Sequence, residues 1–376
     1  MPREGVIPFL NLKPGPDAHD VRAAIDRVLE RGWFVLGPEL EAFEHEFAAA
    51  CGAPYAIGVG TGTDAIALAL RACGIGHGDE VITAPLSAAF SALAVMMAGA
   101  RPVFADIDPV RLTLDPRATD AAVTSRTRAI MPVHLYGQPA DMRAIAAVAA
   151  RHNLLLIEDC CQAHGATCEG RPVGSFGAAA AYSFYPTKNL AALGDGGAIT
   201  TQDSQMAARI ARLRNGGQTD RYKHTEFGVN SRLDELQAAV LRARLRWLPG
   251  WIRERRQLAA EYRKHLAGST VEVPPECDAG HVYHLFPVLA TDRGALQARL
   301  KSHGIETLIH YPVPIPRQPA VASERPDACP VADRVCDQVL SLPLHPGMTS
   351  AAVEEVASAL HASASRPLRF DGQNVQ

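Results

Sequence analysis

None of the eight cysteines in this 376-residue sequence stands in a Cys-x-x-Cys pair, which excludes a zinc knuckle and a thioredoxin motif. A chain of this length can bury a large core and needs no disulfide bonds. We therefore expect free thiols and a reducing, cytoplasmic compartment. The nearest approach to a metal-binding pair is His281 with His284. Alternation along a strand accounts for it better, so no metal is expected.

Strong charge of one sign and long apolar runs are also lacking. The net charge is −3, whereas nucleic-acid binding calls for a broad basic surface, and the arginines within residues 253–256 are interpreted as a solvated helix face. The longest apolar stretch, Ala88–Ala100, is shorter than the roughly 20 residues that cross a bilayer. Residues 1–9 lack the pattern of a signal peptide. We expect a globular enzyme that binds neither nucleic acid nor membrane.

Short β-type runs alternate with helical patterns between residues 55 and 201. This alternation predicts an α/β fold with a mainly parallel central sheet flanked by helices. Several of the runs are continuously apolar, as is typical of strands covered on both faces. The predicted strands are Tyr55–Val59, Glu80–Ala84, Pro102–Asp106, Ala129–Val133, Leu154–Glu158, Ala179–Phe184 and Gly197–Thr201, and the predicted helices are Asp64–Cys73, Ala88–Ala98 and Asp141–Arg151.

A break in a long helical pattern indicates where the chain divides. The pattern runs from Leu233 to about Leu266 and is interrupted at Pro249–Gly250, because proline and glycine both disfavour a helix interior. We expect a large domain over residues 12–248, a smaller C-terminal α+β domain over 249–376, and an extended N-terminal arm over 1–11. The smaller domain should contain a strand near Tyr283–Leu289 and a helix near Arg293–His303.

Ligand sites in such sheets lie at the carboxyl ends of the strands, and the first predicted strand ends in Gly58-Val-Gly-Thr-Gly-Thr-Asp64. Glycines let a backbone approach an anion closely, and a helix N-terminus offers free N–H groups. The turn therefore predicts a phosphate site at Gly62 and Thr63. An ordinary helix start with Thr63 as its cap explains the same residues equally well.

The strand Leu154–Glu158 ends next to Asp159, with Gln162 and His164 following. A carboxylate buried at a strand end needs a cationic partner, and a protonated pyridine nitrogen would serve as one. Such a pairing lets a pyridine ring act as an electron sink. The alternative is a strand-end aspartate that caps the next turn.

A strand of small residues, Ala179–Phe184, leads into a turn that carries Lys188, and Ser183 lies at its end. Desolvation in such a setting lowers the pKa of a lysine and favours the neutral, nucleophilic amine that a Schiff base requires. Taken alone, a lysine in a loop is more often a surface residue.

Together, the three sites form an ordered set that resembles the DegT-type sugar aminotransferases. The resemblance covers about residues 7–360. It is carried by Val35-Leu-Gly-Pro38, Glu158-Asp-Cys-Cys-Gln-Ala-His-Gly165, Ser183-Phe-Tyr-Pro-Thr-Lys-Asn-Leu190, Gly194-Asp-Gly-Gly197 and Asn230-Ser-Arg-Leu-Asp-Glu-Leu-Gln-Ala-Ala239. It implies a type I fold dependent on pyridoxal 5'-phosphate, and a homodimer with active sites shared between the subunits.

The resemblance also implies a role for each matching residue. Lys188 would carry the cofactor as a Schiff base and move protons, cycling it through pyridoxamine 5'-phosphate with L-glutamate as donor. Asp159 would pair with the pyridine nitrogen, and Gln162 with the ring hydroxyl. The phosphate would be held by Gly62, Thr63 and Ser183, and by Asn230 of the other subunit. One position departs from the family: Ala88 stands where an aromatic residue usually stacks on the ring, with Phe90 two residues later.

The substrate implied by the resemblance is a keto-sugar carried on a nucleotide. Leu308-Ile-His-Tyr-Pro-Val-Pro314 resembles enzymes that form 3-amino-6-deoxyhexoses on dTDP, for secondary metabolites or surface glycans. Trp33, His164, Tyr185, His310 and Tyr311 are the candidate substrate residues, although loop packing explains His310 and Tyr311 as well.

Several alternatives remain open at this point. The 4-keto-sugar and aminocyclitol branches are the nearest, although Ser183-Phe-Tyr differs from the Ser-Phe-Gln typical of aminocyclitol enzymes. Dehydratases of the family carry histidine in place of the lysine, so Lys188 argues against them. An NAD(P)-linked sugar oxidoreductase that uses the Gly58–Gly62 turn, and a catalytically silent regulator of the same fold, are the alternatives from other classes.

Overall fold

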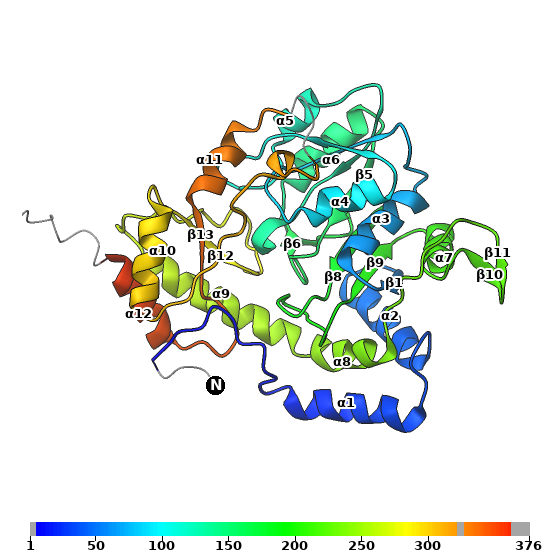
Figure 1. Cartoon of the computed structure of the whole chain (residues 1–376), viewed down its shortest axis with the longest axis horizontal. Helices are drawn as coiled ribbons and strands as arrows, with labels where there is room; N and C mark the ends of the chain where they lie inside the picture. The colour runs from blue at the N-terminus through cyan, green and yellow to red at the C-terminus, as the bar shows by residue number, and fades with distance from the viewer. Residues whose placement is uncertain (1–4, 322–326, 362–376) are drawn as a thin grey trace, which may run out of the picture.

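The computed structural model describes residues 5–321 and 327–361. Its centre is a seven-stranded sheet in the order β1-β9-β8-β5-β4-β2-β3 (Figure 1). β9 runs antiparallel to both of its neighbours, and the other adjacent pairs are parallel. The strands are β1 (Tyr55–Val59), β2 (Glu80–Thr83), β3 (Arg101–Phe104), β4 (Thr127–Met131), β5 (Leu155–Asp159), β8 (Ala179–Ser183) and β9 (Gly197–Thr201). The predicted mainly parallel α/β sheet is confirmed, with shifts of one or two residues at some strand ends.

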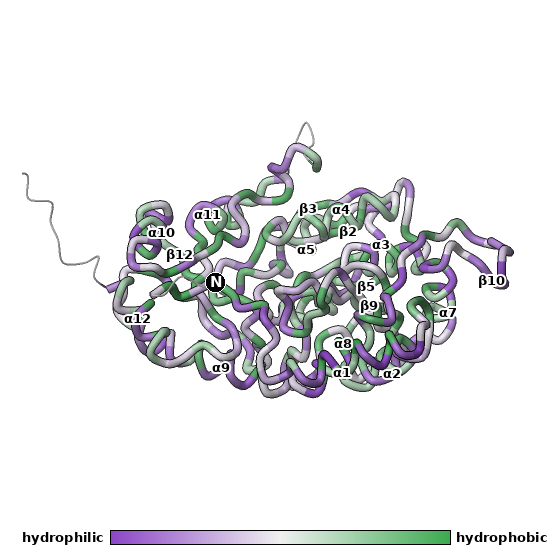
Figure 2. The backbone as a smooth tube through the Cα atoms, turned by 60° about the horizontal axis from the view of Figure 1, so that its bottom comes forward, coloured by the Kyte–Doolittle hydropathy of each residue, from purple (hydrophilic) through white to green (hydrophobic). Residues whose placement is uncertain are grey.

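Helices cover both faces of this sheet. On one face, α3 (Gly62–Ala72), α4 (Phe90–Met97) and α7 (Ser204–Leu213) pack on residues such as Val81 and Ile157. On the other face, the neighbouring strand residues Ile82 and Leu156 join a second core with α2 (Pro38–Ala50), α6 (Met142–Arg151) and α8 (Glu235–Leu245). Successive strand residues thus enter opposite cores, which explains their continuous apolar character. Figure 2 shows the hydrophobic segments gathered along these strands.

Two further helices in this part of the chain are α1 (Ala18–Arg31) and α5 (Pro116–Ala121). The start of α2 is held by a distant residue: the buried Glu235 carboxylate, in the first turn of α8, accepts the N–H groups of Gly37, Glu39 and Leu40. This anion occupies the positive end of the α2 dipole.

The C-terminal part has a hydrophobic cluster of its own, formed around the β12–β13 pair. Its apolar side chains come from α9 (Leu248–His265), β12 (Phe286–Leu289), α10 (Arg293–Ser302), β13 (Val339–Leu342) and α12 (Ser350–His361). α11 (Pro330–Gln338) joins the larger core instead. Near the N-terminus, Ile7 forms a bridge with Ile305 in this region.

Smaller elements decorate the loops. They are β6 (Thr167–Cys168), β7 (Arg171–Pro172), the protruding hairpin β10 (Gln218–Asp220) and β11 (Lys223–His224), and the 3₁₀ turns η1 (Leu135–Gly137) and η2 (Ile315–Arg317). Within the described residues, no helix combines the length and the apolar character needed to span a bilayer.

Several sequence-based expectations need correction. The long helix breaks between Leu245 and Leu248, and Pro249 lies in the first turn of α9, where the missing N–H of proline costs nothing. The second predicted helix begins at Phe90 rather than Ala88, and the later strand at Phe286 rather than Tyr283. Arg255, expected on a solvated face, is buried.

The burial of Arg255 is compensated by hydrogen bonds: its guanidinium donates to the main-chain carbonyls of Tyr283, His284 and Leu344. These carbonyls belong to loops that would otherwise leave buried acceptors unsatisfied. The neighbouring Arg253 is exposed, as predicted.

Candidate active site

Three of the turns singled out in the sequence meet at the carboxyl ends of β1, β5 and β8. Gly62 lies so close to them that an added Cβ would be 2.6 Å from Ser183 Cβ and 3.0 Å from Cys161 Sγ. Gly197, at the start of β9, is held just as tightly, since its Cβ would lie 2.3 Å from the Thr61 carbonyl oxygen. Only glycine fits these approaches, and the two glycines therefore set the position of the β1–α3 turn.

The β1–α3 turn presents two N–H groups that the chain itself does not use. The N–H groups of Gly62 and Thr63 donate to no acceptor within the described part of the chain. The helix cap is Thr61, whose Oγ1 accepts the Asp64 N–H at 3.0 Å, so the alternative in which Thr63 is the cap is wrong. Ser231 braces the same turn: its hydroxyl accepts the Gly60 N–H and donates to Asp64. Free N–H groups at a helix start suit a phosphate.

Asp159 ends β5 and is buried. One carboxylate oxygen accepts the Cys161 N–H at 3.1 Å, and the other accepts the Ser91 hydroxyl at 2.7 Å. Among the described residues, Asp159 forms no ion pair. A buried carboxylate held by two donors but lacking a cation fits the protonated nitrogen of a pyridine ring.

The amide of Gln162 has a defined orientation. Its Oε1 accepts the Tyr136 N–H at 2.8 Å, so the other end of the amide must be the NH₂ group, which donates to the Tyr311 hydroxyl at 3.1 Å. The second Nε2 hydrogen suits an acceptor such as a phenolic oxygen. Tyr136 itself has a left-handed φ of 59°, an uncommon conformation for a tyrosine.

Lys188 follows β8 in a turn in which its N–H donates to the Tyr185 carbonyl. Burial lowers the pKa of Lys188, while the nearby Cys161 and Asp159 oppose that shift. The net pKa is below that of an ordinary lysine, as the sequence predicted. A lower pKa leaves a larger fraction of the amine neutral and therefore available as a nucleophile and proton acceptor.

Three histidines lie within electrostatic reach of Lys188. Burial, and then the Lys188 charge, lower the pKa of His164 to about 3 and that of His310 to about 4, and the same causes lower the pKa of His284. His164 is only 1% exposed, and neither of its ring nitrogens has a hydrogen-bond partner among the described residues. The imidazoles are therefore neutral near pH 7.

The other candidate substrate residues have different surroundings. His310 Nδ1 bonds the Ser341 hydroxyl, and Tyr311 lies against Gln162. Tyr185 is 52% exposed beside the Lys188 turn. Trp33 is 55% exposed and lines a separate pocket of about 420 Å³ before α2. Asn230 is exposed next to Ser231, so its side chain faces outward from this chain.

Phe90 does not replace the aromatic residue that is missing at position 88. Ala88 lies just before α4, and the Phe90 ring is 62% exposed. The same segment instead directs Ser91 inward to Asp159.

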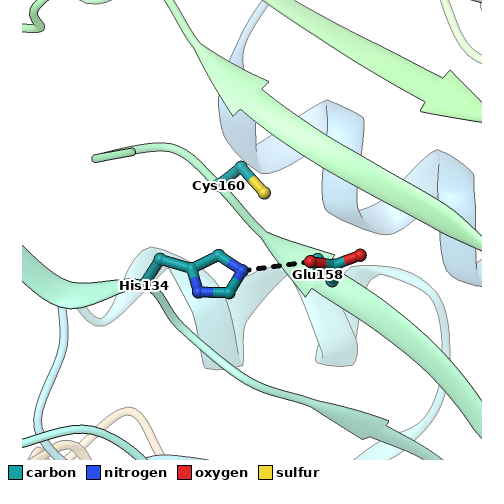
Figure 3. Close-up of side chains that lie close together, drawn as sticks. All are labelled: His134, Glu158 and Cys160. Carbon is teal, nitrogen blue, oxygen red and sulfur yellow. Dashed lines mark hydrogen bonds and ion pairs between the residues drawn. The ribbon is translucent and has the colours of Figure 1, made fainter. Parts of the chain in front are cut away.

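His134, Glu158 and Cys160 form a buried cluster on β5 and the loop beside it (Figure 3). His134 Nδ1 accepts the Ala140 N–H, so the proton lies on Nε2, which donates to Glu158 at 3.2 Å. The Glu158 oxygens also accept the N–H groups of Gly174, Phe176 and Gly177. No imidazole lone pair is left for a metal, and the cluster is an anchor for the loop after β7.

The explanation of His281 and His284 by strand alternation is wrong, because both precede β12. His281 Nδ1 accepts the Tyr283 N–H, and its ring stacks on Tyr283 at 3.8 Å. Sequence reasoning also missed Ser91 and Tyr136, and it considered His284 only as part of a metal-binding pair. No local pattern in these segments shows which side chain turns towards the site.

Comparisons with known proteins agree with this geometry. Residues 17–361 match the model of the DegT/DnrJ/EryC1/StrS aminotransferase family. The dTDP-3-amino-3,4,6-trideoxy-alpha-D-glucose transaminase of Streptomyces venezuelae is 47% identical, with 96% of this chain and 97% of the relative covered. The dTDP-3-amino-3,6-dideoxy-alpha-D-galactopyranose transaminase of Aneurinibacillus thermoaerophilus is 45% identical, with 95% and 99% covered. The crystal structure of S. venezuelae DesV in complex with a ketimine intermediate has a TM-score of 0.94 at 47% identity, with 96% and 99% covered.

Proposed function

Because the chain belongs to the DegT/DnrJ/EryC1/StrS aminotransferase family, we propose that it depends on pyridoxal 5'-phosphate and transfers an amino group from L-glutamate to a dTDP-linked 6-deoxy-keto-hexose, at the 3-position. The observation that carries this proposal is the depressed pKa of Lys188 beside a buried Asp159 that forms no ion pair among the described residues. The names of two relatives, at 45% and 47% identity, support the dTDP-linked substrate and the 3-position. The product would serve a secondary metabolite or a surface glycan.

The residues at the strand ends fit this cofactor. The free N–H groups of Gly62 and Thr63, with the Ser183 hydroxyl, would hold its phosphate, and Asp159 its ring nitrogen. Gln162 would donate to the ring oxygen through Nε2. When bound, pyridoxal phosphate accepts an amino group from a donor and passes it to a keto compound, its ring serving as the electron sink.

Lys188 performs the proton chemistry in this proposal. Its Nζ would hold the cofactor covalently, and the free amine would remove and return a proton as general base and acid. A pKa below the ordinary lysine value keeps the released amine neutral for a larger share of the time. The neutral His164, placed beside it, adds no competing positive charge. His164, Tyr185, His310 and Tyr311 are the proposed contacts to the sugar, and Trp33 to the substrate's outer part.

We further propose a homodimer in which Asn230 reaches the phosphate site of the partner subunit. Large apolar side chains are exposed next to site residues, among them Phe90 beside Ser91 and Tyr185 in the Lys188 turn, and a second copy of the chain would cover them. The division into a large domain over 12–248 and a small one over 249–376 is also a proposal, supported by the separate cluster around β12 and β13. Residues 1–4, 322–326 and 362–376 of that division lie outside the described residues.

The eight free thiols support a reducing, cytoplasmic location.

The alternatives from other classes are not favoured. An NAD(P)-linked oxidoreductase has no use for Lys188 and Asp159 in this arrangement, and the family match is to aminotransferases. A silent regulator would not need a lysine of depressed pKa. Among transaminases, 4-keto-sugars and keto-inositols remain the competing substrates for the test below.

The test is to load the purified protein with pyridoxamine phosphate and offer it a panel of keto compounds. The panel contains dTDP- and UDP-linked 3-keto-sugars, a dTDP-linked 4-keto-sugar and a keto-inositol. We expect the yellow, lysine-bound absorbance to return fastest with the dTDP-linked 3-keto-sugar, and mass spectrometry to find the amine at C3. A faster return with the 4-keto-sugar or the keto-inositol would contradict the substrate assignment.

Lys188→Ala tests the role of the lysine, with Lys301→Ala, on the exposed face of α10, as the matched control. We expect Lys188→Ala to lose multiple turnovers and the yellow absorbance, and Lys301→Ala to keep both. Repeated turnover by Lys188→Ala at near wild-type rate would show that another residue carries the cofactor.

A further inference from the structure

Two buried serines connect the loop before α4 to Asp159. Ser87 and Ser91 are each less than one-twentieth exposed, and their hydroxyl oxygens lie 3.3 Å apart. Ser91 Oγ lies 2.7 Å from Asp159 Oδ2. A serine in the first turn of a helix commonly bonds to its own backbone, whereas Ser91 reaches 68 residues along the sequence to a carboxylate.

The direction of this chain of hydrogen bonds follows from the chemistry of its end. An ionised carboxylate only accepts, so Ser91 donates its single hydroxyl proton to Asp159. Ser87 must then be the donor in the bond between the two hydroxyls. Donation from Ser87 polarises the Ser91 hydroxyl and strengthens its bond to the carboxylate.

These bonds define the plane of the carboxylate. The Cys161 N–H holds Oδ1, and the Ser91 hydroxyl holds Oδ2. Two donors at two different oxygens prevent rotation about the last side-chain bond and leave one lone pair free on each oxygen. Hydrogen bonds that end on a carboxylate are shorter and stronger than those between neutral groups, so this orientation is held firmly.

We infer that Ser91, supported by Ser87, is a positioning residue that holds the Asp159 carboxylate in the orientation that pairs with the ring nitrogen of the bound cofactor, and thereby keeps that nitrogen protonated. The inference rests on the proposed function. The segment between β2 and α4 has no aromatic residue at Ala88 to stack on the cofactor ring. It would act on the cofactor through the bond from Ser91 to the Asp159 carboxylate instead.

The test measures the proton on the ring nitrogen directly. Wild-type protein and the variants Ser91→Ala, Ser91→Thr and Ser87→Ala are loaded with cofactor labelled with ¹⁵N in the ring, and the ¹⁵N chemical shift is followed against pH. Ser302→Ala, at the exposed end of α10, is the control outside the site. The loss of one hydrogen bond to a charged group predicts a proton affinity about ten-fold lower in Ser91→Ala, a midpoint about one pH unit lower.

We expect a smaller shift in Ser87→Ala, near wild-type behaviour in Ser91→Thr, which retains the hydroxyl, and no shift in Ser302→Ala. If Ser91→Ala does not fold, Ser91→Cys, a weaker donor, takes its place with a smaller shift in the same direction. An unchanged midpoint in every folded Ser91 variant lacking the hydroxyl overturns the inference but leaves the proposed function intact. If the wild-type protein binds no cofactor at all, both fail.

A cofactor analogue with C–H in place of the ring nitrogen separates positioning from a general structural role. Ser91→Ala and wild-type protein should bind this analogue equally well, because Asp159 then has no cation to hold. If Ser91→Ala weakened binding of the analogue as much as it weakened binding of the natural cofactor, Ser91 would contribute only to packing.

Discussion

Replacing His164 by phenylalanine should make the stability of the protein less sensitive to acid. The His164 ring is buried against Tyr182 and Phe184, with centroid distances of 5.7 and 5.6 Å, and its pKa is about 3 rather than the ordinary 6.5. The folded state therefore holds the neutral ring, whereas the unfolded chain takes up a proton below pH 6.5. Stability is lost as the pH falls from about 6.5 towards 3.

The magnitude follows from the width of that window. At pH 5.0, which is 1.5 units below the unfolded value of 6.5, one such histidine costs about 2 kcal/mol of unfolding free energy, at 1.36 kcal/mol per unit. Phenylalanine cannot be protonated, so His164→Phe should lose about 2 kcal/mol less than wild type between pH 7.5 and pH 5.0. The measurement is urea denaturation of the cofactor-free protein at both pH values.

His281→Phe is a matched control. His281 is also buried and also has a pKa of about 3, so its pH-dependent gain should be about the same. At pH 7.5 the two should differ, because His281 accepts the Tyr283 N–H and stacks on that ring, while both nitrogens of His164 are without a partner among the described residues. His281→Phe should therefore be the less stable by about 1–3 kcal/mol, the cost of an unsatisfied buried donor. Equal acid sensitivity of His164→Phe and wild type would refute the reasoning.

Three further predictions follow from the site. Gly197→Ala should weaken cofactor binding about ten-fold, measured by fluorescence titration, because its Cβ would lie 2.3 Å from the Thr61 carbonyl oxygen and displace the phosphate turn; unchanged binding would show that the turn tolerates the shift. Asp159→Asn removes a charge that raises the pKa of Lys188, so the pH at which the cofactor-free protein begins to react with pyridoxal phosphate should move lower, and a move to higher pH would contradict the assignment. Dialysis against a chelator should leave the melting temperature unchanged, because the imidazole lone pair of His134 is already used by Ala140; a drop restored by zinc would overturn that interpretation.

The fold was largely predictable because its signals are local. A continuously apolar run such as the one around Ile157 predicts a strand that is covered on both faces of the sheet. The glycine-rich turn after β1 predicts the start of a helix. The prediction failed where two local rules competed. Proline usually ends a helix, but Pro249 lies in a first turn, where it is tolerated.

The sequence by itself determined the chemistry available: the order of Gly62, Asp159 and Lys188 along the chain, their places at strand ends, and the resemblance that these motifs carry. Only the tertiary structure decided which groups act on them. Ser91 reaches Asp159, Tyr136 orients Gln162, and three histidines lie within electrostatic reach of Lys188. These contacts join residues distant in sequence, and pKa values and hydrogen-bond directions depend on such neighbours rather than on spacing along the chain.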